Sequence, residues 1–154
     1  ILTLAREGSD IGEMGVVETQ EMLEDCWENV ETGNATVVNE LECKLEADPR
    51  RLKQVCENLV RNAVEHAGDD VTVTVGELED RNGFYIADDG EGIPEEERDD
   101  VFETGYSTSE HGTGFGLSIV EEIVTAHGWD IEATESKDGG ARFEVSGVEM
   151  PKEA

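Results

Sequence analysis

Apolar residues recur along this chain with a helical period in three segments. The spacing predicts a helix over residues 18–30, a longer helix over residues 48–67, and a third helix from about residue 114 to Gly128. Asp48 and Pro49 mark the start of the longer helix, because an aspartate accepts hydrogen bonds from free backbone N–H groups and proline fits the first helical position. The buried stripe of this helix is predicted to consist of Leu52, Val55, Cys56, Leu59, Val60, Ala63 and Val64.

Other segments alternate between apolar and polar positions, which is typical of half-buried strands. Strands are predicted through Leu41, Cys43 and Leu45, over residues 71–75 and over residues 84–88, and a closing hairpin is predicted over residues 129–145. Residues 94–111 are acidic and turn-rich, so they predict a long loop of the kind that forms lids. The fold class is therefore α+β: a two-layer α/β sandwich with helices on one face of a mixed sheet.

The charge of the chain is unusual for a domain of 154 residues. Aspartate and glutamate number 39 against 11 lysines and arginines, which gives a formal net charge of −28. A disordered acidic tail is disfavoured because the acids are spread through periodic segments, and a surface for a basic partner would be patchy. We favour a solvated acidic surface of the halophilic kind, whose self-repulsion is screened by salt. The same charge disfavours nucleic acid as a partner.

Two further observations bear on the environment of the chain. No run of 18 apolar residues and no signal peptide is present, so the segment is expected to be cytoplasmic, although its parent protein could be anchored in a membrane. Cys26, Cys43 and Cys56 lack the spacing of metal ligands, and we interpret them as buried free thiols.

Two asparagines lie one turn apart on the long predicted helix. Asn58 and Asn62 flank its buried stripe. Their amide oxygens suit Mg²⁺, which is usually held by few protein groups together with substrate phosphates. The alternative is that both are merely exposed or capping residues.

A carboxylate and two glycines follow the strand predicted at residues 84–88. In the sequence DDGEGIP, Asp88 ends an apolar strand, where a carboxylate is costly unless a donor satisfies it, and a purine amino group is such a donor. Gly90 and Gly92 permit close approach of a flat ring. The alternative is a simple Asp-Gly turn.

A glycine-rich segment, HGTGFGL, precedes the third predicted helix. Gly112, Gly114 and Gly116 permit a loop whose N–H groups point at an anion, next to the positive end of a helix. The segment is not a P-loop, because it lacks GK[ST], and it lacks the βαβ context of a dinucleotide fold. The alternative is a glycine-rich hinge.

These segments together resemble the boxes of one ATPase family. ENLVRNAVEHA resembles the N box, DDGEGIP the first glycine box, VFETGYST the phenylalanine-containing box and GTGFGL the second glycine box of the sensor histidine kinase catalytic domain. This domain belongs to the superfamily of gyrase, the heat-shock ATPases, histidine kinases and MutL. The resemblance covers roughly residues 16–147, implies the Bergerat-type ATP-binding fold with an ATP lid, and is greatest to haloarchaeal members.

The resemblance also implies roles for individual residues. Asn62 would be the Mg²⁺ asparagine and Asn58 its neighbour in the catalytic and metal site, His66 would pack near the adenine, and Asp88 would bind the adenine amino group. Ser107 and Thr108 would lie on the lid. The remaining positions that the boxes place at the ATP cleft are Gly90, Gly92, Ile93, Gly112, Thr113, Gly114, Gly116 and Leu117.

Departures from the family pattern refine the expected chemistry. Hydrolases of the superfamily keep a general-base glutamate four residues before the Mg²⁺ asparagine, and here that position is Asn58. Transfer to an imidazole is therefore expected rather than efficient hydrolysis by water. Arg142 stands where relatives often have a small hydroxyl residue, which puts a water-bridged adenine contact there in doubt.

The resemblance implies a phosphotransferase that is only part of a larger protein. Residues 1–15 resemble the end of a dimerisation and phosphoacceptor helix plus a connector, and residues 16–150 the ATP-binding catalytic domain. None of His66, His111 and His127 suits the role of phosphoacceptor, so the acceptor histidine is expected upstream. The implied partners are ATP, that helical domain and a response regulator receiver domain, in a homodimeric parent. The alternatives are a nucleotide-responsive binding module and an anti-sigma-type serine kinase of the same superfamily.

Overall fold

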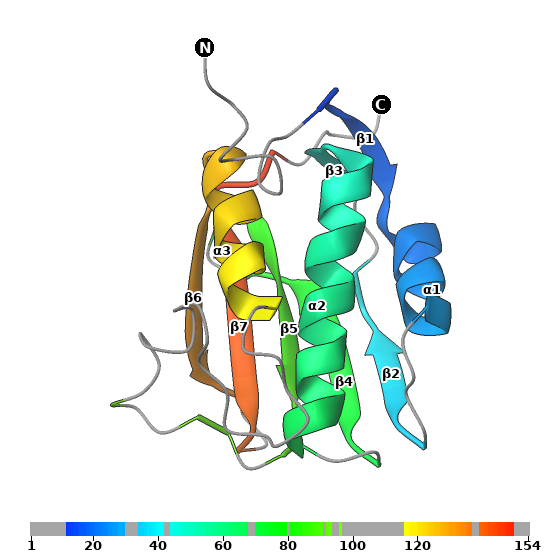
Figure 1. Cartoon of the computed structure of the whole chain (residues 1–154), viewed down its shortest axis with the longest axis vertical. Helices are drawn as coiled ribbons and strands as arrows, with labels where there is room; N and C mark the ends of the chain where they lie inside the picture. The colour runs from blue at the N-terminus through cyan, green and yellow to red at the C-terminus, as the bar shows by residue number, and fades with distance from the viewer. Residues whose placement is uncertain are drawn as a thin grey trace.

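The computed structural model describes residues 12–29, 34–41, 44–67, 70–79, 81–90, 92–93, 96, 116–136 and 139–149. Three helices and seven strands lie within these ranges (Figure 1). In chain order they are β1 (Gly15–Glu18), α1 (Thr19–Asn29), β2 (Thr36–Asn39), β3 (Lys44–Ala47), α2 (Pro49–Ala67), β4 (Thr72–Glu77), β5 (Gly83–Asp88), α3 (Gly116–Ala126), β6 (Asp130–Glu135) and β7 (Ala141–Ser146).

The strands form one five-stranded sheet and one two-stranded ribbon. The larger sheet has the order β2-β4-β5-β7-β6, and β1 pairs with β3 in the ribbon. Strand β2 is parallel to β4, whereas the other neighbours in the sheet are antiparallel. The sheet is therefore mixed, as the sequence predicts.

The helices cover one face of this sheet. Figure 1 shows α2 and α3 side by side in front of the sheet, and α1 beside α2 next to the edge strand β2. The inner face of α2 is apolar, and its most buried side chains are exposed by at most 3%. They pack in one core with alternate residues of the central strands, which makes the predicted two-layer sandwich. The α2 members of this core are Leu52, Val55, Cys56, Leu59 and Ala63.

The predicted start of α2 and the predicted end of α3 are confirmed. Asp48 precedes α2, and its Oδ1 accepts the backbone N–H groups of Arg50 at 3.1 Å and Arg51 at 3.4 Å. Gly128 follows α3 with φ +84°, a conformation that favours glycine after the end of a helix. No described helix has both the length and the apolar character that a membrane span requires.

The N-terminal strands differ from the prediction. The strand expected through Leu41, Cys43 and Leu45 begins only at Lys44, and Leu41 is buried in the preceding turn, where its N–H donates to Asn39 Oδ1 at 3.1 Å. Cys43 lies outside the described residues. Strands β1 and β2 are not predicted at all, because each is a four-residue strand and their patterns of burial are weak.

Candidate functional site

Asp88 is a buried carboxylate at the carboxyl end of β5. Its side chain is 7% exposed and faces the helical layer, since β5 alternates and Phe84 and Ile86 face the core. Its Oδ1 accepts two backbone N–H groups, from Gly90 at 3.0 Å and from Ala141 at 3.1 Å. Two donors on one oxygen offset the cost of burying the charge and fix the orientation of the carboxylate.

Two glycines allow the segments around this carboxylate to pack closely. Gly92 has φ +81°, and a Cβ there would lie 2.7 Å from the carbonyl oxygen of Gly139. A Cβ on Gly140 would lie 2.2 Å from the carbonyl oxygen of Asp88 and 2.3 Å from its Oδ1. The loop after β5 and the β6–β7 hairpin thus meet around Asp88 at distances that exclude any side chain at these two positions.

The second part of the site lies on α2, which packs against β5. Asn58 and Asn62 are half-buried and one turn apart, beside the buried stripe, as predicted. The Oδ1 atom of Asn58 accepts a hydrogen bond from Arg61 Nη1 at 3.0 Å. A guanidinium beside Asn58 makes its oxygen a poorer ligand for a cation, which distinguishes the two asparagines.

The C-terminal half of α2, the end of β5, the start of β7 and the start of α3 lie at the same end of the molecule (Figure 1). Gly116 begins α3, and Leu117 is half-buried against the core, as is Ile93 after the second glycine turn. The structure therefore brings the asparagine helix, Asp88 and the helix that follows the glycine-rich segment to one place. Among the described residues no group of three or more His, Cys, Asp and Glu side chains could hold a metal ion by itself.

Several predicted site residues cannot be placed. His66 lies in the last turn of α2, but its side chain is outside the described part of the structure. The glycine-rich segment and the lid are outside it as well. The predicted residues concerned are Ser107, Thr108, Gly112, Thr113 and Gly114.

Arg142 does not lie beside the Asp88 carboxylate. Its guanidinium lies 3.9 Å from the centre of the Tyr85 ring, and its Nε donates to Glu144 Oε2 at 2.7 Å. Arg142 pairs with Ala87, so its side chain leaves the sheet on the face opposite Asp88. The residue beside the buried carboxylate is Ala141, and Arg142 does not bear on the site.

Gly140 and Ala141 belong to the site although sequence reasoning did not assign them to it. The Gly139-Gly140 pair is interpreted there only as a hairpin turn. Two consecutive glycines were the sequence signal for a tight contact here, because a turn with one left-handed residue needs only one glycine. In the structure only Gly139 of this pair has a positive φ. The second glycine is required by the contact with Asp88.

Comparison with known proteins agrees with this geometry. A model of the family described as histidine kinase-, DNA gyrase B- and HSP90-like ATPase matches residues 47–152, which include α2, β5 and α3. The chain belongs to this family. Its described fold is the one that the resemblance implied.

The similar curated proteins are sensor histidine kinases. Sensor histidine kinase ZraS of Klebsiella oxytoca is 40% identical over 104 residues, which cover 66% of this chain and 22% of that protein. Signal transduction histidine-protein kinase AfsQ2 of Streptomyces coelicolor is 39% identical over 101 residues, which cover 62% of this chain and 19% of that protein. The chain spans about a fifth of these relatives and is a histidine kinase-type catalytic domain.

Solved structures give the same result. The catalytic domain of histidine kinase ThkA superposes with a TM-score of 0.74 at 26% identity, covering 91% of this chain and all of that one. The mycobacterial sensor histidine kinase MprB, at 23% identity, has the same fold, with a TM-score of 0.71 and coverage of 90% of this chain and 97% of that one.

Proposed function

We propose that this domain binds Mg·ATP and transfers its γ-phosphoryl group to a histidine on a helical domain upstream of residue 16. The observation that carries the proposal is the buried Asp88 carboxylate, fixed by the N–H groups of Gly90 and Ala141. Asp88 is the last residue of β5, and this end of β5 lies at the end of the molecule where α3 begins (Figure 1). A fixed carboxylate in this position suits the amino group of adenine and would repel the carbonyl oxygen that guanine has there.

Asn62 is the residue that we propose as the Mg²⁺ ligand. Asn62 is half-buried on the edge of α2, and its amide oxygen adds no negative charge beside a triphosphate. Asn58 is held by Arg61 in the structure, so we assign it to positioning of the phosphates rather than to a second metal bond. Bound Mg²⁺ would neutralise the charge that develops on the phosphate oxygens.

The proposed transfer forms a bond between an imidazole nitrogen of the acceptor and the γ-phosphorus. It breaks the bond to the bridging oxygen, which leaves with ADP. Asn58 supports transfer over hydrolysis, because an amide cannot take a proton from an attacking water as a glutamate would. The groups proposed to face the phosphates on the lid are Ser107, Thr108, Gly112, Thr113 and Gly114, with Gly116 and Leu117 at the start of α3. His66 is proposed to pack near the adenine.

The adenine assignment is tested by the ratio of ATP affinity to GTP affinity. We expect Asp88→Asn to lose most of this selectivity, because an amide can also donate to the guanine oxygen. The matched control is Asp89→Asn: Asp89 is the next residue, is exposed, and accepts from the backbone N–H of Thr72 at 2.9 Å, a bond that asparagine can still accept. An unchanged ratio in Asp88→Asn, or an equal loss in both variants, would refute the site.

The metal assignment is tested by the Mg²⁺ dependence of ATP binding. We expect Asn62→Ala to abolish this dependence and Asn58→Ala to weaken ATP binding while retaining it. Asn34→Ala is a matched control, since Asn34 is exposed in the turn before β2. Retained Mg²⁺ dependence in Asn62→Ala contradicts the assignment.

The transfer reaction itself requires the upstream domain of the parent protein. Incubation of both domains with Mg²⁺ and γ-labelled ATP should give an acid-labile, alkali-stable label on the upstream domain, as expected for phosphohistidine. ATP binding without such a label would favour a nucleotide-responsive module, and an acid-stable label would favour a serine kinase. The proposed partners are this helical domain and a receiver domain, in a homodimeric parent.

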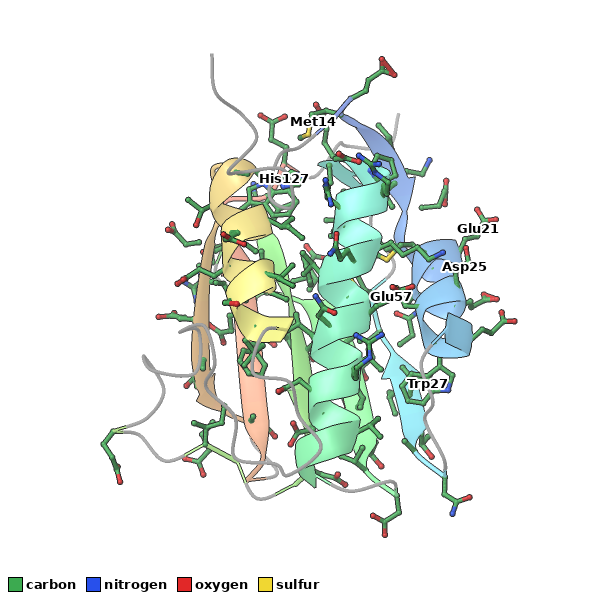
Figure 2. The ribbon with its side chains drawn as sticks, in the orientation of Figure 1. Met14, Glu21, Asp25, Trp27, Glu57 and His127 are labelled. Carbon is green, nitrogen blue, oxygen red and sulfur yellow. The ribbon has the colours of Figure 1, made fainter. Side chains whose placement is uncertain are left out.

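We also propose that the acidic surface is an adaptation to high salt. Ion pairs among the described residues join Lys44 to Glu18 at 3.4 Å, Arg81 to Glu132 at 3.2 Å and Arg142 to Glu144 at 2.7 Å. The large excess of acids over cations therefore leaves many carboxylates for water and salt, and Figure 2 shows oxygen-tipped side chains around the outside of the ribbon. Screening of such charges is strong at molar salt.

A further inference from the structure

The end of the molecule away from Asp88 contains a second buried carboxylate. Asp48 is 4% exposed. Its Oδ1 caps the first turn of α2, while its Oδ2 accepts the backbone N–H of Gly12, in the segment that enters the domain. A single carboxylate therefore ties the incoming chain to the helix that bears Asn58 and Asn62.

The backbone N–H of Asp48 is bound by His127, which follows α3. This N–H donates to His127 Nε2 at 3.1 Å, and His127 Nδ1 lies 2.9 Å from the carbonyl oxygen of Ile123. Because Asp48 N is a donor, Nε2 must be the acceptor, so the proton is assigned to Nδ1, which donates to Ile123. The ring also stacks on Trp129, with centroids 4.0 Å apart. Figure 2 shows His127 at the upper end of α3, near the start of α2.

This contact joins the residue after α3 to the residue before α2, two helices that lie side by side. Sliding of one helix along the other by about 1 Å would stretch the Asp48–His127 hydrogen bond beyond its normal range. The opposite ends of the same helices carry Asn62 and the start of α3, where reacting groups must be placed to within about 0.5 Å. The register of α3 against α2 thus bears directly on the phosphate-binding end.

We propose that His127 and Asp48 are positioning residues that set this register, and that Gly12 connects the incoming segment to it. The inference rests on the proposed ATP-binding function. Its consequence is specific: loss of the contact should weaken binding of the triphosphate, which needs α2 and α3 together. It should spare recognition of adenosine, which depends on Asp88 at the end of β5. The reciprocal consequence is that a change at Gly12 should alter ATP affinity.

The test compares dissociation constants for Mg·ATP and for adenosine in the full chain. His127→Phe keeps an aromatic ring on Trp129 but removes both ring nitrogens, and we expect Mg·ATP affinity to fall on the order of 10-fold while adenosine affinity is unchanged. His127→Gln keeps an acceptor and should recover part of the loss. A merely structural role would lower both affinities by the same factor or neither, and either result would overturn the proposal.

Gly12 is tested in the same assay. Gly12→Pro removes the N–H that Asp48 accepts. Gly12→Ala is the comparison variant: it retains this N–H and adds a Cβ 3.2 Å from Asp48 Oδ2, a contact that needs a shift of only a few tenths of an ångström. We expect Gly12→Pro to weaken Mg·ATP binding and to be non-additive with His127→Phe, since both act on one unit. Additive effects, or equal effects of proline and alanine, would show that Gly12 does not act together with Asp48 and His127.

Failure of the proposed function has a different signature: the wild-type chain would not bind ATP, or Asp88→Asn would keep its nucleotide selectivity.

Discussion

Replacement of Gly140 by alanine tests whether the backbone around Asp88 is built for that carboxylate. A Cβ at this position would lie 2.2 Å from the carbonyl oxygen of Asp88, 2.3 Å from its Oδ1 and 2.6 Å from its carbonyl carbon. Real Cβ atoms essentially never come within 3.0 Å of such atoms, so Oδ1 would have to move by about 0.7 Å to reach that limit. The backbone atoms cannot rotate away as a flexible side chain would.

The magnitude follows from two effects on the same group. Overpacking at a tight site costs about 1–3 kcal/mol in the free energy of unfolding. Movement of the carboxylate also weakens the hydrogen bond from Ala141 N–H, which is 3.1 Å long, and a bond to a charged group contributes about 1.5–3 kcal/mol. We therefore expect Gly140→Ala to lower the free energy of unfolding by about 3 kcal/mol and the ATP affinity of the folded domain by at least about tenfold.

Gly139→Ala is the matched control in the same hairpin. Gly139 has φ +94°, so alanine is strained there by roughly 1–2 kcal/mol, but a Cβ would contact nothing within 4 Å. Denaturant unfolding in high salt gives the stability of each variant, and calorimetric titration of the folded proteins gives their ATP affinity. We expect the control to lose stability while binding ATP normally. Normal ATP binding by folded Gly140→Ala would refute the argument that this glycine positions Asp88.

Three other predictions concern the rest of the domain. The melting temperature should rise as salt is increased toward the molar range, and a flat salt series would contradict the halophilic interpretation of the net charge of −28. A hydrogen bond to the Cys26 side chain and burial raise the pKa of the Cys56 thiol, so a thiol reagent should label neither cysteine until the protein is unfolded, as mapped by peptide mass spectrometry. Burial raises the pKa of the Asp48 carboxyl, but hydrogen bonds from backbone N–H groups, first that of Gly12, together lower it by more. The net shift of the pKa is therefore downward. The Asp48 carboxylate should therefore stabilise the folded domain at pH values above its pKa in the unfolded chain, and this stabilisation should be lost as pH falls through its lower pKa in the folded domain. Acid titrations of unfolding should not show this loss in Asp48→Asn.

The sequence predicts those elements whose signals are local and strong. The stripe from Leu52 to Ala63 runs through most of α2, which has 19 residues, and the cap at Asp48 needs only the next three residues. The closing hairpin also follows from periodicity and turn residues. The fold class and the helices that support the site could therefore be predicted from pattern alone.

The N-terminal strands could not be predicted, because their order depends on partners far along the chain. Strand β2 pairs in parallel with β4, although α2 separates them along the chain, and β1 pairs with β3, although α1 separates them along the chain. Val16 and Val38 are exposed in these strands, so burial gives little alternation to detect. These four-residue strands form because they pair with distant strands, not because of an amphipathic pattern, and the partner of a strand cannot be read from a single sequence.

The same distinction explains what could be predicted about the site. Asp88 and Gly92 were identified because they belong to one turn, whereas the donor at Ala141 is 53 residues away from the carboxylate that it holds. His127 lies 79 residues from the Asp48 N–H that it binds, and the sequence predicts only that it is not the phosphoacceptor. Local motifs thus name the groups that we propose to touch the nucleotide. The contacts that fix those groups join separate elements, so we expect substitutions at Gly140 and His127 to weaken nucleotide binding although neither residue lies in one of the four motifs.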